Sequence, residues 1–230
     1  MIRSILAMAG AALLSVAPAV ADDTASEVAS EVERIAGPLP RFFPHLESYL
    51  DIPDAERSHF RMAYVVSSAD GIPPEDIRMW YDHDGETHQF ALDATGRITR
   101  LPGLPALDAE PDVWINQPAG GGFSLSMQFE YSGPGATEFS RDALAMSVEQ
   151  ANRAIRSAAG VAALFAPRME SVVFVFDGAA PEAWAVDQDG ERSPLTVQEN
   201  RAFFRPADRR SRSIERIEFG REPVSILLDS

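Results

Sequence analysis

The sequence predicts an α+β protein made predominantly of antiparallel β-strands, and three observations lead to this fold class. Short segments in which apolar and polar residues alternate recur along the chain, separated by Asp-Gly, Gly and Pro turn signals. One longer segment, 140–159, carries an apolar stripe at helical spacing. The composition, with 45% hydrophobic and 24% charged residues, is that of an ordinary globular domain rather than a disordered chain.

Residues 1–21 have the organisation of a cleavable secretory signal peptide. Arg3 supplies a positive charge, an apolar run covers 5–16, and Ala19-Val20-Ala21 is a small-x-small cleavage site. The run is shorter than the roughly 20 residues that a membrane span requires, so an uncleaved anchor is the less favoured alternative. We therefore expect an exported, soluble protein, periplasmic or secreted, with no membrane span after cleavage.

Residues 22–58 are predicted to form a helix and a proline-rich lead-in to the sheet. A short helix is expected over 24–36, ended by a Gly-Pro pair. Its apolar stripe consists of Val28, Val32 and Ile35. Prolines interrupt the rest of the lead-in, which leaves room for only a turn or two of helix.

Residues 59–118 are predicted to form a first β-module, a meander of short antiparallel strands. Asp84-Gly85 is a strong signal for a two-residue hairpin turn. The strands before and after this turn are expected at 60–66, 77–82, 87–92 and 98–101.

Residues 119–230 are predicted to form a second, related β-module. Segment 60–66 aligns with 123–129 at an offset of 63, and 90–101 aligns with 184–195 at an offset of 94. The difference of 31 residues indicates an insertion into the second copy.

The insertion contains the amphipathic helix 140–159, with Ser140 as the candidate N-cap, and we expect this helix to pack on the second module. Its apolar stripe is Leu144, Val148, Ala151, Ile155 and Ala158. After the helix, the almost continuous apolar run 172–176 predicts a central strand buried on both faces. Further strands are expected at 202–204, 214–219 and 224–228.

Composition excludes several kinds of chemistry. The chain has no cysteine and no lysine, so disulfides, thiol nucleophiles, Schiff bases and a P-loop lysine are ruled out. The net charge of −15 becomes −16 without the signal peptide, which argues against nucleic acid and anionic membranes as general partners. There is also no Gly-x-Ser-x-Gly or His-Glu-x-x-His motif.

The hairpin tip at 81–88 offers a candidate metal site. If Asp84-Gly85 forms the turn, His83 faces Glu86, and alternation places His83, Glu86 and His88 on one face. Two imidazoles and a carboxylate suit zinc or non-haem iron. The alternative is a solvated polar hairpin tip without a ligand.

The pattern Asp-x-Asp-Gly-Glu occurs twice, at 82–86 and 187–191, and acids around a glycine can bind calcium. The other ligands of an EF-hand are missing, and Asp and Gly are common turn residues for conformational reasons alone. Turn chemistry is the better interpretation of both segments.

Charge reverses near the end of the chain. Residues 201–221 contain seven arginines and three acids, a balance of +4, which leaves −20 for the rest of the mature chain. Guanidinium groups recognise carboxylates and phosphates. The candidate anion-binding residues are Arg205, Arg209, Arg210 and Arg212. The alternative is that these arginines pair with the protein's own acids.

These observations favour a non-enzymatic exported binding module whose partner is an envelope protein or an anionic polymer, and not nucleic acid. The competing hypothesis is a metal-dependent enzyme that uses His83, Glu86 and His88. No cofactor other than that divalent metal is indicated. The sequence identifies no catalytic residue and leaves the oligomeric state open.

Overall fold

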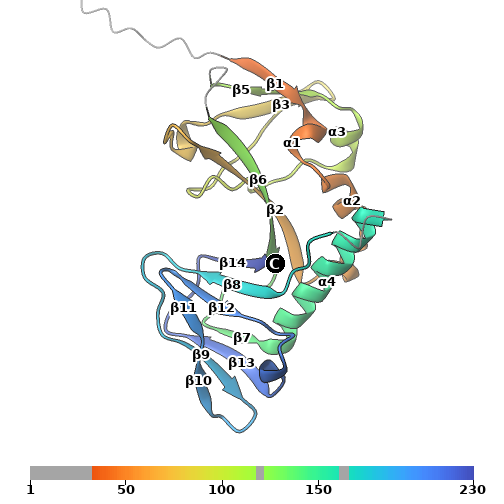
Figure 1. Ribbon diagram of the computed structural model, residues 1–230. Helices are drawn as coiled ribbons and strands as arrows, with labels where there is room; N and C mark the ends of the chain where they lie inside the picture. Colours follow the sequence, from red (N-terminus) through yellow and green to blue (C-terminus); the bar gives the residue numbers. More distant parts are fainter. Residues whose placement is uncertain (1–32, 118–121, 161–165) are drawn as a thin grey trace, which may run out of the picture. The chain divides into compact units, whose positions relative to one another are not determined.

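The computed structural model describes residues 33–117, 122–160 and 166–230 (Figure 1). The predicted signal peptide lies outside the described residues. The described residues form three sheets, and every strand pair in them is antiparallel. The predicted fold class, α+β with mostly antiparallel strands, is therefore confirmed. No helix among the described residues is long and apolar enough to cross a membrane.

The first sheet has the order β1-β5-β3-β4. Its strands are β1 Arg34–Pro38, β3 Met79–His83, β4 Glu86–Gln89 and β5 Asp112–Ile115. The short helices of this part of the chain are α1 Leu39–Phe42, α2 Leu46–Leu50 and α3 Leu104–Asp108. Asp84 and Gly85 both have positive φ, 53° and 77°, so the predicted two-residue hairpin turn between β3 and β4 is present.

The second sheet has six strands in the order β11-β12-β8-β14-β6-β2. They are β2 Phe60–Ser68, β6 Phe123–Tyr131, β8 Ser171–Val175, β11 Thr196–Gln198, β12 Arg201–Phe204 and β14 Ser225–Asp229. β8 lies inside the sheet and is buried along almost its whole length, as its apolar run predicted.

The third sheet has the order β10-β9-β13-β7. Its strands are β7 Glu138–Ser140, β9 Ala183–Asp187, β10 Arg192–Pro194 and β13 Ile214–Phe219. The aromatic rings of Phe139, Phe174, Phe176 and Phe219 contact one another between this sheet and β8. These contacts join the second and third sheets through one apolar core.

The pairing of β2 differs from the predicted meander. β2 is not a neighbour of β3; it pairs along all nine of its residues with β6, from Phe60 opposite Tyr131 to Ser68 opposite Phe123. β2 and β6 are equally long, so they pair along their whole length, which β2 and the shorter β3 could not do. One strand from each predicted module therefore lies in the same sheet. That the two modules are copies of one repeat stays a prediction.

The N-terminal helix prediction is wrong where it can be tested. Residues 24–32 lie outside the described part of the chain, but 34–36 belong to β1, which pairs with β5. Ile35, predicted to lie on a buried helical face, is 48% exposed. Backbone pairing with a strand some 80 positions away overrides the local helical pattern here.

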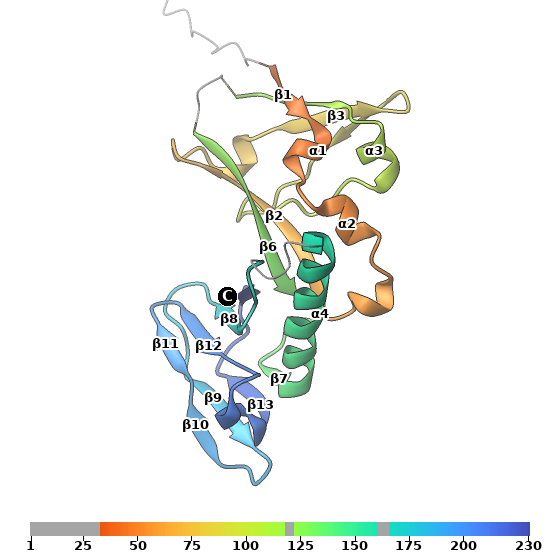
Figure 2. The same ribbon diagram turned by 45° about the vertical axis from the view of Figure 1, so that its right-hand side comes forward.

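Helix α4, Arg141–Ala159, confirms the helix predicted over 140–159. Leu144, Val148 and Ala151 of its predicted stripe are buried, whereas Ile155 is half-buried and Ala158 exposed. Ser140 precedes the helix, but its side chain makes no capping hydrogen bond. The helix contacts β13, β7 and β8, and also runs beside β2 and β6 (Figure 2), so it packs on strands of both predicted modules.

One local feature of the proposed repeat is seen in the structure. The turns at 93–97 and 187–191 have the same hydrogen bonds: Asp93 and Asp187 each accept from the glycine three residues later, and their N–H groups donate to Arg97 and Glu191. Gly96 and Gly190 have nearly the same φ, 80° and 81°. The aligned sequences therefore encode the same turn.

Candidate functional site

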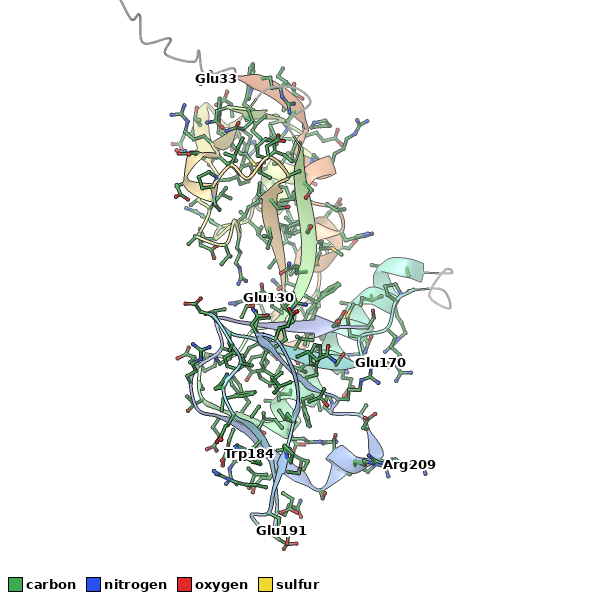
Figure 3. All side chains as sticks on the ribbon, turned by 60° about the vertical axis from the view of Figure 1, so that its left-hand side comes forward. Glu33, Glu130, Glu170, Trp184, Glu191 and Arg209 are labelled. Atoms are coloured by element: carbon green, nitrogen blue, oxygen red, sulfur yellow. The ribbon has the colours of Figure 1, made fainter. Side chains whose placement is uncertain are left out.

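The predicted anion-binding arginines lie on one loop, residues 205–212, which we call the basic loop. It follows β12 and ends in the 3-10 turn η4, Arg209–Arg212. Pro206 and Ser211 are buried, and the Pro206 carbonyl oxygen accepts a hydrogen bond from Arg141 at 3.1 Å. These anchors fix the loop while all four arginines remain exposed; Figure 3 shows Arg209 projecting from η4.

The four arginines of the basic loop form no ion pair and no side-chain hydrogen bond within the described residues. Arg216, a few residues later, behaves differently, because Glu138, Glu215 and Glu218 all lie within 3.7 Å of its guanidinium. Hydrogen bonding to Glu218 raises the pKa of Arg216. Pairing with the protein's own acids therefore accounts for Arg216 but not for the basic loop.

A cavity of about 560 Å³ opens beside the basic loop. Arg205 and Arg210 line it together with Asp208 and Asp229. Its apolar lining includes Leu195, Phe203 and Ile214, and its border includes residues of β11. β11 is an edge strand with all three residues exposed, so this cavity combines charges of both signs, apolar surface and an unpaired strand edge.

The hairpin histidines take the predicted register but do not assemble the predicted metal site. His83 lies opposite Glu86 and the rings of His83 and His88 are 6.2 Å apart. However, the His83 Nε2 faces Asp84 at 3.3 Å, the His88 ring stacks on Tyr81 at 5.0 Å, and Glu86 is exposed. Within the described residues, no group of three or more His, Cys, Asp or Glu side chains could hold a metal ion.

The two Asp-x-Asp-Gly-Glu segments use their first aspartates for turn hydrogen bonds. The Asp187 Oδ1 accepts the N–H groups of Asp189 and Glu191, at 3.0 and 2.9 Å. The Asp82 Oδ1 accepts the hydroxyl of Thr87 at 2.6 Å. This geometry supports turn chemistry over calcium binding at both places.

An apolar cavity of about 320 Å³ lies between α2, the second half of α4 and the β2–β6 pair. Its lining includes Tyr49, Met62, Met127, Phe129 and Ile155, with few polar groups. Its few polar lining residues are His45, Ser48 and Tyr49.

The side chain of Glu130 is the most buried of the carboxylates that form ion pairs among the described residues, and its role is structural. It is only 3% exposed and accepts hydrogen bonds from Arg61, at 3.0 Å, and from Arg97. Arg97 belongs to the turn that hydrogen-bonds to β2, so Glu130 holds this turn against the β2–β6 pair (Figure 3).

Comparison of the chain with protein-family models, with curated proteins and with solved structures finds no match in any of the three. Any functional assignment must therefore rest on the sequence and on the surfaces described above.

Proposed function

We propose that this protein is an exported, non-enzymatic binding module that recognises an acidic protein partner through the basic loop. The observation that carries the proposal is that four exposed arginines gather on one anchored loop and remain unpaired within the described residues, although the chain has 35 acidic residues. Guanidinium groups bind carboxylates through paired, charge-assisted hydrogen bonds. Export rests on the signal-like organisation of residues 1–21.

Two features favour an acidic protein over an anionic polymer. Outside 201–221 the chain carries a net charge of −19, which repels a long uniform polyanion. The cavity beside the basic loop also contains Asp208 and Asp229 next to apolar side chains. A protein segment can place carboxylates on the arginines and apolar groups in the cavity, and its backbone can add to the free edge of β11.

The proposal is tested by fluorescence anisotropy with a short labelled peptide of Asp, Glu and Phe, and with labelled polyphosphate as the polymer. The double variant Arg209→Glu with Arg212→Glu should weaken peptide binding about tenfold or more at low salt. The matched control is Arg41→Glu with Arg156→Glu, which makes the same charge change at two other exposed arginines.

Equal weakening by both pairs of substitutions would mean that the peptide senses only the overall charge, and the basic loop would not be the site. Tighter binding of polyphosphate than of the peptide would contradict the choice of a protein partner and would identify an anionic polymer.

A further inference from the structure

A cavity of about 430 Å³ lies where the β3–β4 hairpin faces residues 100–106, on elements separate from the basic loop. Its size falls in the range of roughly 300–1,000 Å³ that is common for small-molecule sites. One wall consists of Tyr81, His83 and His88 from the hairpin, and another contains Arg100.

The lining of this cavity contains no aspartate or glutamate, although the protein is strongly acidic. Its polar groups can donate hydrogen bonds: the Arg100 guanidinium only donates, and the two imidazoles and the side chains of Tyr81 and Gln89 donate as well as accept. Arg100 forms no ion pair with any described residue. The nearest carboxylate to the imidazoles is Asp84, an exposed side chain in contact with His83.

The backbone holds these donors in place before any ligand arrives. The Thr99 N–H donates to the Ala91 carbonyl oxygen at 2.9 Å, which fixes the residue just before Arg100. Pro102 and Pro105 stiffen the following segment, and the His88 ring is held by stacking on Tyr81. Preorganised donors lose less entropy on binding and therefore bind more tightly.

The charge of Arg100 acts inside the cavity. Burial raises the pKa of the Tyr81 hydroxyl, and the positive charge of Arg100 partly opposes that rise. The guanidinium thus stabilises negative charge at a group that lines the cavity wall.

We infer that this cavity binds a small molecule carrying a carboxylate or phosphate group, held by Arg100 and the imidazoles of His83 and His88. The anion of the ligand supplies a partner for the exposed Arg100 guanidinium, which forms no ion pair among the described residues. The inference extends the proposed function, because it assigns a small ligand to a second site.

The test is an NMR titration of the mature protein with inorganic phosphate and, separately, with succinate, using chloride at equal ionic strength as the reference. The Arg100 Nε–H and His88 ring signals should shift saturably with a midpoint below about 1 mM for at least one of the two anions. The better binder then identifies phosphate or carboxylate as the preferred group.

Arg100→Gln should weaken this binding about tenfold or more, whereas Arg41→Gln, at an exposed arginine outside the cavity, should leave it unchanged. If Arg100→Gln loses the dispersed spectrum of a folded protein, His88→Gln serves as the second variant. Absence of saturable shifts with both anions, or undiminished binding in a folded cavity variant, would overturn the inference.

Discussion

Gly96 and Gly190 occupy the same position in two turns with the same hydrogen bonds, but only Gly96 is closely packed. A Cβ atom at Gly96 would overlap the Val66 carbonyl oxygen, whereas nothing lies within 4 Å of a Cβ at Gly190. Both residues have a left-handed φ that favours glycine. Replacing each of these two glycines with alanine therefore measures separately how much the left-handed backbone conformation and how much steric overlap destabilise the folded protein.

We expect Gly190→Ala to reduce the free energy of unfolding by about 1–2 kcal/mol, the backbone cost alone. Gly96→Ala should cost about 2–5 kcal/mol, because overlap adds about 1–3 kcal/mol to the same backbone cost. Urea unfolding of the two variants measures both values. An equal decrease in the free energy of unfolding of both variants would mean that the turn at 93–97 can move away from β2 at no cost in stability.

Glu130 provides the second prediction at this scale. Glu130→Gln removes the charge that Arg61 and Arg97 share at a buried position, and should lower the free energy of unfolding by about 1–3 kcal/mol. Glu149→Gln, in an exposed helical pair with Arg153, is the control and should change it by less than about 0.5 kcal/mol. A smaller effect at Glu130 than at Glu149 would contradict its structural role.

At the scale of elements, the turn at 93–97 contains a carboxylate with a shifted pKa. Burial alone would raise the pKa of Asp93. Hydrogen bonds from the Thr95 hydroxyl and from the N–H groups of Thr95 and Arg97, together with the charge of Arg97, lower it below its usual range. A carboxylate with a lowered pKa stabilises the folded state above its unfolded pKa, and this contribution is lost as pH falls through the folded pKa.

Asp93→Asn should therefore destabilise the protein at pH 7, with the difference from the wild type shrinking below about pH 4, near the unfolded pKa of aspartate. Urea unfolding at a series of pH values measures this, and Asp108→Asn at an exposed acid controls for the loss of one negative charge. If the difference in the free energy of unfolding between the wild type and Asp93→Asn persists unchanged into strong acid, the Asp93 charge does not contribute to stability.

Elements with local signals were predictable from the sequence, and those made by distant pairing were not. The Asp84-Gly85 turn, α4 and the strand over 214–219 follow from turn chemistry and periodicity. β1 and the pairing of β2 with β6 depend on partners far along the chain, about which periodicity says nothing. The turn between the strands predicted at 87–92 and 98–101 was likewise predictable, from its Asp and Gly residues.

The candidate sites also have some features that the sequence predicts and others that only the structure shows. Clustering of Arg205, Arg209, Arg210 and Arg212 is visible in the sequence, but only the structure shows that they lack ion pairs among the described residues. Alternation correctly placed His83 and His88 on one face. Alternation could not predict which other residues line the cavity beside these two histidines. Arg100, from another segment of the chain, lines this cavity, whereas Glu86 does not.

At the scale of the whole molecule, charge is unevenly distributed along the chain. Residues 201–221 carry +4 and the rest of the chain −19. A large net negative charge discourages non-specific association with polyanions. If an acidic partner binds through the basic loop, as we propose, its association should weaken as salt concentration rises.

The most direct test of the central claim, that the basic loop recognises a protein partner outside the cytoplasm, is site-specific photo-crosslinking in cells. A photoreactive residue is placed at exposed Ala207 of the tagged, exported protein, and another at Met146 on α4 as the control position. We expect one reproducible protein adduct from position 207 with an acidic contact segment, lost with Arg209→Glu and Arg212→Glu and absent from position 146. Adducts that are the same from both positions, or that survive the two substitutions, would contradict the proposed role of the basic loop.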